Sequence, residues 1–468
     1  MWSLENAEFY LSEDKTLTVP QLRISPGSCL VITGGNGSGK TVLARAIAGK
    51  LKLVKGNRSG PVSDALVSMD EQLLLWDKAL KAANTDLVKD GEELVPTGRQ
   101  LLADFPDALS LATAFGLDHA LDRPFTVLSS GEGRKLLLIK ALVGNEPILL
   151  LDEPFSGLDI QARKVLMQRL TELHQAGTTL VLVVNRRDEI PDFCEQIAKL
   201  ADCQLNELVS PDQLLGDVKP AADIALPAPP KAPAAVARPL LKVVDLTIRY
   251  QGNTIIDGLS WTLAPGQHWQ IAGPNGAGKS TLLSVLTGEN PQGFSNEVYL
   301  FGKRRGSGET LWDIRQSQGL VSPALHGAYR VNCSALDVVL SGFFDSIGLY
   351  QNAGDNLRQL ARQWLGIIGM ANKADHAFLA LSYGEQRLLL IARAMVKHPP
   401  LLILDEPYQG IDENYRLRIN GFLNHLMEKG ESQLLLVTHH QDDCPKGITH
   451  QLLFVPEGEG WHYQQMPL

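Results

Sequence analysis

The chain has 468 residues, 44% hydrophobic and 20% charged, which is enough for two globular domains of about 200 residues each. Its formal net charge of −9 argues against nonspecific binding to nucleic acid or anionic lipid. The five cysteines include no C-x-x-C pair, and no apolar run approaches the roughly 18–20 residues that cross a bilayer, which excludes a disulfide scaffold and a membrane-spanning chain and indicates a cytoplasmic protein.

In the first half we expect a strand, a glycine loop and a helix, followed by a helix-rich insert and then by buried strands. The loop is GGNGSGKT at 34–41, and LSSGEGRK follows at 128–135. An apolar run ends in acidic residues in ILLLDEPFSGLD at 148–159, and a later one, VLVVN, ends at Asn185. Apolar runs without polar alternation are typical of strands covered on both faces, so we expect an α/β domain with a mostly parallel sheet.

A segment rich in alanine and proline, residues 217–239, separates the two halves. Fourteen of its 23 residues are Ala or Pro, a composition typical of a passive, semi-extended tether. We therefore expect one domain at 1–216 and another at 240–468.

The second half repeats the landmarks of the first in the same order, which indicates an internal duplication. They are GPNGAGKS at 273–280, LSYGEQRL at 381–388 and LLILDEPYQGID at 401–412. The first two landmarks are 14 residues further apart in the second half, which places a variable insert in the middle of each domain. The predicted fold is two tandem phosphate-loop NTPase domains of the α/β class, each with a mostly parallel sheet and a helical insert.

The pattern G-x-x-x-x-G-K-[ST] after an apolar strand predicts a phosphate-binding loop. Its glycines let backbone N–H groups turn toward phosphate, and the next helix presents its positive end. The two lysines would reach the β- and γ-phosphates, and the hydroxyls of Thr41 and Ser280 would bind Mg²⁺. The predicted loop residues are Gly34, Gly35, Asn36, Gly37, Ser38, Gly39, Lys40 and Thr41, with Gly273, Pro274, Asn275, Gly276, Ala277, Gly278, Lys279, Ser280 and Thr281 in the second half.

Each apolar run that ends in Asp-Glu predicts the metal side of a nucleotide site. Asp152 and Asp405 would hold Mg²⁺, while Glu153 and Glu406 would orient or deprotonate the attacking water. The alternative is an acidic turn that only ends a strand. The serine of the preceding motif lies 23 residues before the aspartate in both halves, which favours Mg²⁺-dependent ATP hydrolysis.

The segments LSSGE and LSYGE distinguish this chain from other phosphate-loop proteins. Because Ser-x-x-Glu is also a capping box, Ser129 and Ser382 can simply close a helix N-terminus. A capped helix end with a serine hydroxyl and a glycine N–H is also an anion receptor. The two interpretations are compatible, and the second adds Gly131 and Gly384 to the candidate nucleotide-binding residues.

Together these motifs resemble those of the ATP-binding-cassette superfamily, over nearly the whole chain outside the linker. The resemblance implies that two cassettes stack head to tail, with each ATP between the phosphate loop of one cassette and the serine-glycine signature of the other. It also implies that the turns SGLD at 156–159 and QGID at 409–412 lie across the shared interface. In that family a strand-end histidine contacts the γ-phosphate and an upstream aromatic residue stacks on adenine.

The same resemblance makes the two composite sites unequal. The strand-end histidine is His439 in the second half, where the first half has Asn185, which cannot carry the charge of an imidazole. The aromatic residue is Tyr250, and Leu11 takes its place in the first half. We therefore expect both sites to bind ATP and site two to carry most of the hydrolysis. Site two would use Tyr250, Lys279, Ser280, Asp405, Glu406 and His439 with Ser129 and Gly131, and site one would use Lys40, Thr41, Asp152, Glu153 and Asn185 with Ser382 and Gly384.

One further residue of the family pattern is matched in only one half. Gln72 is the candidate for the glutamine that links metal to the helical insert, whereas the second half has Pro323 near that point and no glutamine. Lys303, Arg304 and Arg305 form one compact basic cluster, expected to be a solvated loop face or else a docking patch for an acidic partner.

Residues 241–468 resemble more closely the double cassettes associated with molybdate uptake. This resemblance implies an ATP-hydrolysing subunit at the inner face of the cell membrane that works with separate permease subunits and binds no nucleic acid. A double cassette acting on the ribosome is the alternative, although such chains usually have a charged helical linker. A DNA-repair cassette is disfavoured because zinc-finger and coiled-coil patterns are absent. The cassettes could pair within one chain or in a homodimer.

Overall fold

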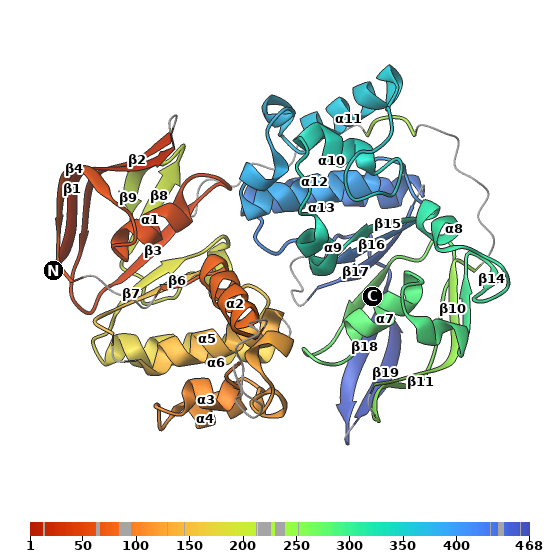
Figure 1. Cartoon of the computed structure of the whole chain (residues 1–468), viewed down its shortest axis with the longest axis horizontal. Helices are drawn as coiled ribbons and strands as arrows, with labels where there is room; N and C mark the ends of the chain where they lie inside the picture. The colour runs from red at the N-terminus through yellow and green to blue at the C-terminus, as the bar shows by residue number, and fades with distance from the viewer. Residues whose placement is uncertain are drawn as a thin grey trace. The chain divides into compact units, whose positions relative to one another are not determined.

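The computed structural model describes residues 1–468 apart from 13–14, 62–65, 84–94, 129, 145, 212, 214–225, 230–238, 251, 431, 439–443 and 459. Ser129, His439 and most of the predicted linker lie outside the described residues. Residue contacts divide the chain into two compact units, Met1–Val218 and Lys219–Leu468 (Figure 1). Both units combine a mixed, mostly parallel sheet core with helices, so the predicted α/β class is confirmed. The finer boundaries at 216 and 240 stay a prediction.

The described residues of the first unit form a nine-stranded sheet with the order β4-β1-β2-β9-β8-β3-β7-β6-β5. The five strands from β8 to β5 run parallel to one another. The strands are β1 (Trp2–Ser12), β2 (Lys15–Ile24), β3 (Cys29–Gly34), β4 (Leu53–Ser59), β5 (Leu66–Val67), β6 (Ile148–Asp152), β7 (Thr179–Val183), β8 (Gln196–Ala201) and β9 (Gln204–Val209). The helices are α1 (Lys40–Ile47), α2 (Met69–Ala83), α3 (Gly98–Leu102), α4 (Ala108–Ala114), η1 (Asp118–Ala120), η2 (Phe125–Val127), α5 (Ser130–Val143), α6 (Ile160–Gln175) and η3 (Arg187–Glu189).

The second unit divides its strands between two sheets, β11-β10-β13-β14 and β15-β16-β17-β12-β18-β19. The strands are β10 (Leu241–Tyr250), β11 (Asn253–Leu263), β12 (Trp269–Ala272), β13 (Glu297–Leu300), β14 (Lys303–Arg304), β15 (Gln318–Val321), β16 (Leu401–Asp405), β17 (Gln433–Val437), β18 (His450–Glu457) and β19 (Gly460–Pro467). The helices are α7 (Lys279–Leu286), η5 (Pro291–Phe294), α8 (Leu311–Gln316), α9 (Pro323–Ala328), α10 (Ala335–Ser341), α11 (Asp355–Ile367), η6 (Ala371–Lys373), η7 (Phe378–Ala380), α12 (Tyr383–Met395) and α13 (Glu413–Lys429).

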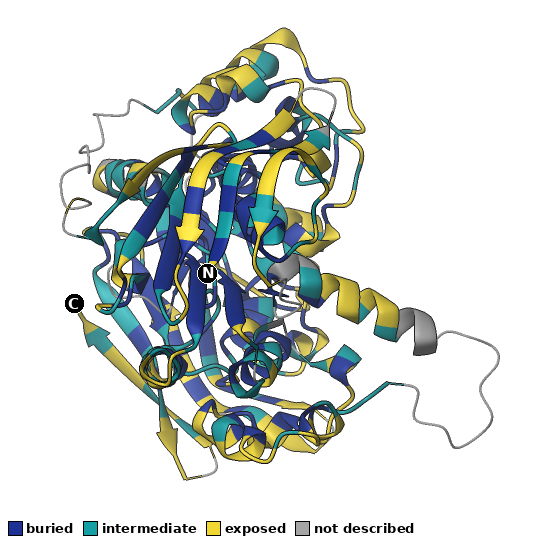
Figure 2. Ribbon diagram, turned by 90° about the vertical axis from the view of Figure 1, so that its left-hand side faces the viewer, coloured by how far each residue is buried: buried dark blue, intermediate teal, exposed yellow. Residues whose placement is uncertain are grey.

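The strands that end in Asp-Glu are buried on both faces, as their unbroken apolar runs predict. In β16, Leu401 and Ile403 pack into the core formed with β10, β11 and α7, whereas Leu402 and Leu404 pack into the core formed with α10 to α12. Figure 2 shows the buried residues concentrated in strands and on the inner sides of helices. Burying each such side chain contributes about 1.5–3 kcal/mol, so this double burial holds the strand that carries the acidic pair rigidly in place.

The length difference between the units lies early in each domain. The sequence separation between the phosphate-loop lysine and the end of the strand that pairs with the acidic strand differs between the units. It is 27 residues in the first unit (Lys40 to Val67) and 42 in the second (Lys279 to Val321). The second unit uses the extra residues for β13, β14 and α8. The helical inserts that follow are equal in length to within one residue, so positions in them can be matched between the units.

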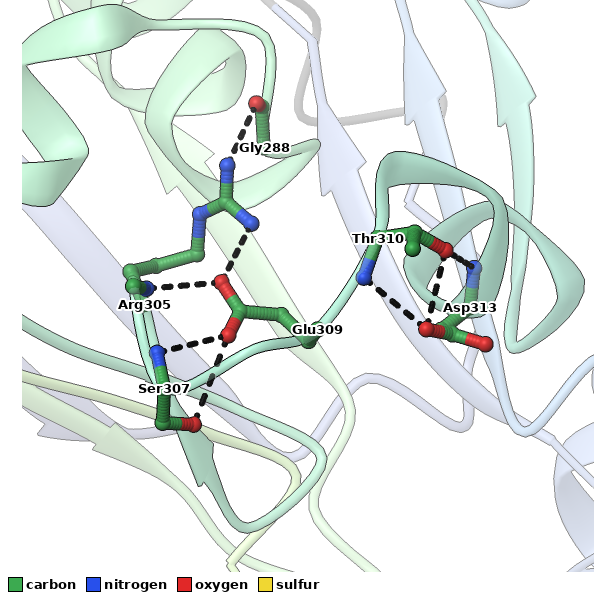
Figure 3. A network of polar contacts seen from close by, with 7 residues as sticks. Gly288, Arg305, Ser307, Glu309, Thr310 and Asp313 are labelled. Atoms are coloured by element: carbon green, nitrogen blue, oxygen red, sulfur yellow. Dashed lines mark hydrogen bonds and ion pairs between the residues drawn. The ribbon is translucent and has the colours of Figure 1, made fainter.

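The three basic residues of the predicted cluster are not one surface patch. Lys303 and Arg304 are exposed in β14, but Arg305 is buried. Its Nη1 donates to Glu309 Oε1 at 2.7 Å and its Nη2 donates to the carbonyl of Gly288 at 3.1 Å (Figure 3). Arg305 therefore ties the segment after β14 to the end of α7, and the cluster is reduced to two exposed side chains.

Among the described residues, no helix combines the length and the apolar character needed to cross a membrane.

Candidate nucleotide-binding and catalytic site

The two glycine loops have the same backbone geometry. Each connects the end of a parallel strand, β3 or β12, to a buried helix, α1 or α7. Gly34 and Gly273 have φ of 152° and 150°, and a Cβ on Gly34 would lie 2.3 Å from the carbonyl oxygen of Leu200. Only glycine fits there, because any side chain would collide with backbone.

Both phosphate-loop lysines fold back over their own loops. Lys40 Nζ donates to the carbonyls of Gly34 at 2.8 Å and Gly35 at 3.0 Å. Lys279 Nζ donates to the corresponding carbonyls of Gly273 at 2.8 Å and Pro274 at 2.6 Å. Each ammonium group is thus held at the mouth of a loop whose N–H groups precede a helix N-terminus, an arrangement suited to an anion.

The predicted metal-side aspartates are both buried at the ends of their strands, and in the first unit Thr41 lies close to the aspartate. Asp152 ends β6 beside the first turn of α1, and the neighbouring hydroxyl of Thr41 acts to lower the pKa of its carboxyl group. Burial, followed by the charge of Glu153, raises the pKa of Asp152 to about 7. Burial likewise raises the pKa of Asp405 to about 6, against the opposing charges of Arg387 and Lys279.

The environment of Asp152 fits a bound cation. The side chain is 6% exposed, and among the described residues its Oδ1 has no hydrogen-bond partner. A buried carboxylate costs free energy unless a cation or donor compensates it, and a hard oxygen ligand beside a threonine hydroxyl is a set that Mg²⁺ prefers.

The acidic pairs share an unusual backbone conformation. Glu153 and Glu406 have φ of 51° and 48°, in the left-handed region that residues other than glycine rarely adopt. Such strain persists only where the surroundings fix it, and it is concentrated at functional sites.

Two arginines of the signature helices fix this conformation. Arg134 Nη2 donates to the carbonyls of Asp152 at 2.6 Å and Glu153 at 2.7 Å. Arg387 Nη2 donates to the carbonyls of Asp405 and, at 2.8 Å, Glu406. We did not predict these arginines from the sequence, although both stand five residues after the serine in LSSGEGR and LSYGEQR, and their repetition was the available signal.

Asn185 lies directly against the predicted catalytic carboxylate of the first unit. It follows β7, and its Nδ2 donates to Glu153 Oε1 at 2.7 Å. In the second unit the matching position is His439, outside the described residues. The residue that takes the histidine's place is therefore in a position to orient Glu153.

The second signature segment is a helix cap as well as a candidate nucleotide contact. The Ser382 hydroxyl accepts from the N–H of Glu385 at 3.4 Å, and the Glu385 carboxylate accepts from the N–H of Ser382 at 2.9 Å. Gly384 follows in the first turn of α12, while in the first unit Gly131 lies in the first turn of α5. The capping box expected from Ser-x-x-Glu is thus formed at Ser382.

The turns after the acidic pairs also begin helices. Asp159 of SGLD caps α6 by accepting from the N–H of Ala162 at 2.8 Å. Asp412 of QGID caps α13 in the same way, accepting from the N–H of Tyr415 at 3.0 Å. These aspartates fix where each turn leaves the acidic strand.

The residues predicted to differ at the adenine also differ in environment. Tyr250 is 46% exposed at the end of β10, and its hydroxyl accepts from Asn290 Nδ2 at 2.8 Å. Leu11 is half-buried against the first unit's core, while Tyr10 is 56% exposed. Tyr250 therefore offers an exposed aromatic ring, whereas Leu11, the residue predicted to match it in the first unit, is a half-buried aliphatic side chain.

The family model "ABC transporter" matches residues 17–156 and 256–409, which contain both glycine loops and both acidic strands. The chain belongs to the ABC transporter family. It is therefore an ABC-type ATPase with two ATP-binding cassettes, and the predicted ATP binding and ATP hydrolysis agree with this membership.

Similar proteins match most of the chain. The chain is 47% identical to the ABC transporter ATP-binding protein ModF of Escherichia coli, over 97% of each chain. It is 29% identical to an uncharacterized ABC transporter ATP-binding protein of Schizosaccharomyces pombe, over 72% of this chain and 69% of the relative. The predicted resemblance to ModF-like double cassettes is confirmed.

Solved structures of double-cassette proteins share the fold. An archaeal ribosome recycling factor, crystallised with a ribosomal stalk protein, has a TM-score of 0.64 at 18% identity, covering 99% of this chain and 90% of that chain. The structure titled RNase-L Inhibitor has a TM-score of 0.61 at 18% identity over the same shares. At this identity the likeness concerns the ABC fold alone.

Proposed function

We propose that this protein is an ABC-type ATPase subunit that supports molybdate uptake through separate membrane permease subunits. The carrying observation is the 47% identity to ModF across nearly the whole of both chains. The resemblance of residues 241–468 to molybdate-associated double cassettes supports the same assignment. On this proposal the protein works in the cytoplasm at the inner face of the cell membrane.

The proposed chemistry uses two composite sites, each formed by the phosphate loop of one cassette and the signature of the other. Lys40 and Lys279 bind phosphate, and Glu153 and Glu406 orient the attacking water. Ser382 and Gly384 complete site one, while Ser129 and Gly131 complete site two. The duplicated loops, strained acidic pairs and capped signature helix support this arrangement. It can form within one chain or between two copies.

We also propose a magnesium ion at each site. Thr41 with Asp152, and Ser280 with Asp405, would hold it. When bound, Mg²⁺ neutralises charge on the phosphates. The buried Asp152 carboxylate, whose Oδ1 has no hydrogen-bond partner among the described residues, and the neighbouring hydroxyl of Thr41 support the assignment in the first unit.

Site two is proposed to carry most of the hydrolysis. His439 supplies an imidazole that can carry charge, whereas Asn185 supplies an amide that already bonds Glu153. Tyr250 supplies the ring that Leu11 lacks. Both differences favour site two.

The proposal of a transport partner is tested by trapping a complex. Full-length Glu406→Gln protein, incubated with ATP and Mg²⁺, is purified from detergent-solubilised membranes, with ADP-loaded protein as the control. We expect ATP-dependent retention of a membrane permease and a molybdate-uptake defect in cells that express only this variant. Co-purification of ribosomes in place of a permease would instead support the ribosomal alternative and overturn the transport assignment.

A further inference from the structure

A buried histidine of the second unit, His326, lies between the strand β15 and the signature helix α12. It follows β15, whose last residue, Val321, pairs with Leu404 immediately before Asp405. Ser322 caps α9 by accepting from the N–H of Leu325 at 3.1 Å. His326 closes that turn and is only 8% exposed. The imidazole thus lies on α9, the short helix that follows the strand beside the metal edge of site two.

Gln72 has the same position in the first unit. Val67 ends β5 and pairs with Leu151 immediately before Asp152. The following Ser68 accepts from the N–H of Glu71 at 3.2 Å, and Gln72 is also 8% exposed. In both units the residue of interest is the fifth after the strand end. His326 is therefore the structural counterpart of Gln72, which the sequence alone did not reveal.

The imidazole of His326 contacts the first two turns of the signature helix α12. It stacks on Tyr383 with ring centroids 4.4 Å apart and an interplanar angle of 21°. Its Nε2 lies 2.8 Å from Gln386 Oε1. In the first unit the same helix position is Gly133, where a Cβ would lie 3.1 Å from Gln72 Nε2. Both residues therefore pack on the fourth position after the signature serine.

The hydrogen bond from His326 has a defined direction. Gln386 Nε2 donates to the carbonyls of Phe378 at 3.1 Å and Leu381 at 3.0 Å, so Gln386 Oε1 is left to accept from His326 Nε2–H. Burial, aided by the nearby charge of Arg387, lowers the pKa of His326. A neutral imidazole with its proton on Nε2 donates to Gln386 and is also the form that the lowered pKa favours.

We infer that His326 is a positioning residue for the second signature, fixing the first turn of α12 through Tyr383 and Gln386. This inference rests on the proposed function, in which Ser382 and Gly384 of that turn contact nucleotide at site one. Because α9 directly follows the strand that pairs with β16 next to Asp405, His326 connects the metal edge of site two to the signature that serves site one. The second cassette thus makes this contact to its signature helix with an imidazole stacked on Tyr383. The first cassette makes the corresponding contact with the amide of Gln72 against Gly133.

The test measures each site separately in the full-length chain. Single-turnover ATP hydrolysis is followed in a Glu406→Gln background, which leaves site one, and in a Glu153→Gln background, which leaves site two. We expect His326→Ala to slow site one about tenfold, because one buried hydrogen bond and one aromatic stack are together worth a factor of this order. Site two should change less than about twofold.

Two further variants separate the contacts. His326→Phe keeps an aromatic ring on Tyr383 but loses the N–H donor, and His326→Gln keeps a donor for Gln386 but loses the stack. Each should slow site one about threefold, as expected for loss of one of the two contacts. Partial rescue by both variants distinguishes positioning from simple loss of volume.

The matched control is His398→Ala. His398 is also buried, at 5% exposure, but its ring lies edge-on to Trp364 at 6.0 Å rather than on Tyr383. If His326→Ala lowers both sites equally, with the same fall in melting temperature as His398→Ala, the role is structural only. If it slows site two alone, His326 serves its own nucleotide. Either result overturns the inference.

A Ser382→Ala variant tests the underlying site assignment independently. It should slow site one in the Glu406→Gln background whatever the role of His326. If it slows only site two, the proposed composite arrangement fails, and the failure is distinguishable from that of His326.

Discussion

The two acidic strand ends have nearly identical backbones and different neighbours. Glu153 and Glu406 share a left-handed conformation, and Arg134 and Arg387 make the same paired contacts to the carbonyls. The residues around these strand ends differ: Asn185 donates to Glu153, and against the neighbouring signature helix His326 takes the place of Gln72. The two units thus share the backbone geometry that holds the acidic pair, whereas the side chains near each nucleotide site differ.

The largest expected effect comes from replacing the predicted catalytic glutamates, which tests whether the two sites differ in ATP hydrolysis. Glu406→Gln should lower the single-turnover rate of ATP hydrolysis by about 10²–10³-fold, because a positioned general base contributes a factor of this order. Glu153→Gln should lower that rate less than about threefold, since on the proposed function site one contributes little of the total. Single-turnover assays with excess protein measure both. If Glu153→Gln abolishes hydrolysis and Glu406→Gln barely matters, the asymmetry is assigned backwards.

A second test asks whether the shared backbone frame depends on its arginine. Arg387→Met leaves two buried carbonyls without their donor, so the second unit should lose about 2–4 kcal/mol of stability. Calorimetry of the full-length chain should show one transition shifted downward. Arg315→Met is the control: this arginine pairs with Glu289 on the surface, with side chains 41% and 46% exposed, and should change stability by less than about 0.5 kcal/mol. Equal shifts for the two variants would contradict a special role for Arg387.

Motifs predicted the duplicated frame well because their chemistry is local. The glycine loops and Asp-Glu strands follow from spacing and from unbroken apolar runs, and these features lie where the sequence places them. The contacts of Arg134 and Arg387 were missed because they reach backbone carbonyls of a distant strand, which no pattern of side chains identifies. His326 was missed because its match to Gln72 depends on where the extra residues of the second unit lie. Arg305 was misassigned because a run of basic residues does not reveal burial against Glu309.

A third test concerns the expected adenine contact. Tyr250→Ala should weaken ATP binding at site two about tenfold, since stacking of a base on an aromatic ring is worth about 1–1.5 kcal/mol. Tyr10→Ala, which removes an exposed tyrosine from the first unit, should change ATP binding at site one less than about twofold. Titration with a fluorescent ATP analogue in the two Glu→Gln backgrounds measures both constants. Equal weakening at both sites would assign adenine contacts to Tyr10 as well and remove this part of the asymmetry.

The smallest expected effect restores the histidine in the first unit. Asn185→His, measured in the Glu406→Gln background, should raise site-one turnover about threefold, because an imidazole can carry the charge that the amide cannot. The opposite outcome is equally informative. If turnover falls while ATP binding and melting temperature are unchanged, the 2.7 Å bond from Asn185 to Glu153 is what keeps the carboxylate in its productive orientation. Site one would then be adapted to its amide, and the lower activity proposed for it would need another cause, such as Leu11 in place of Tyr250.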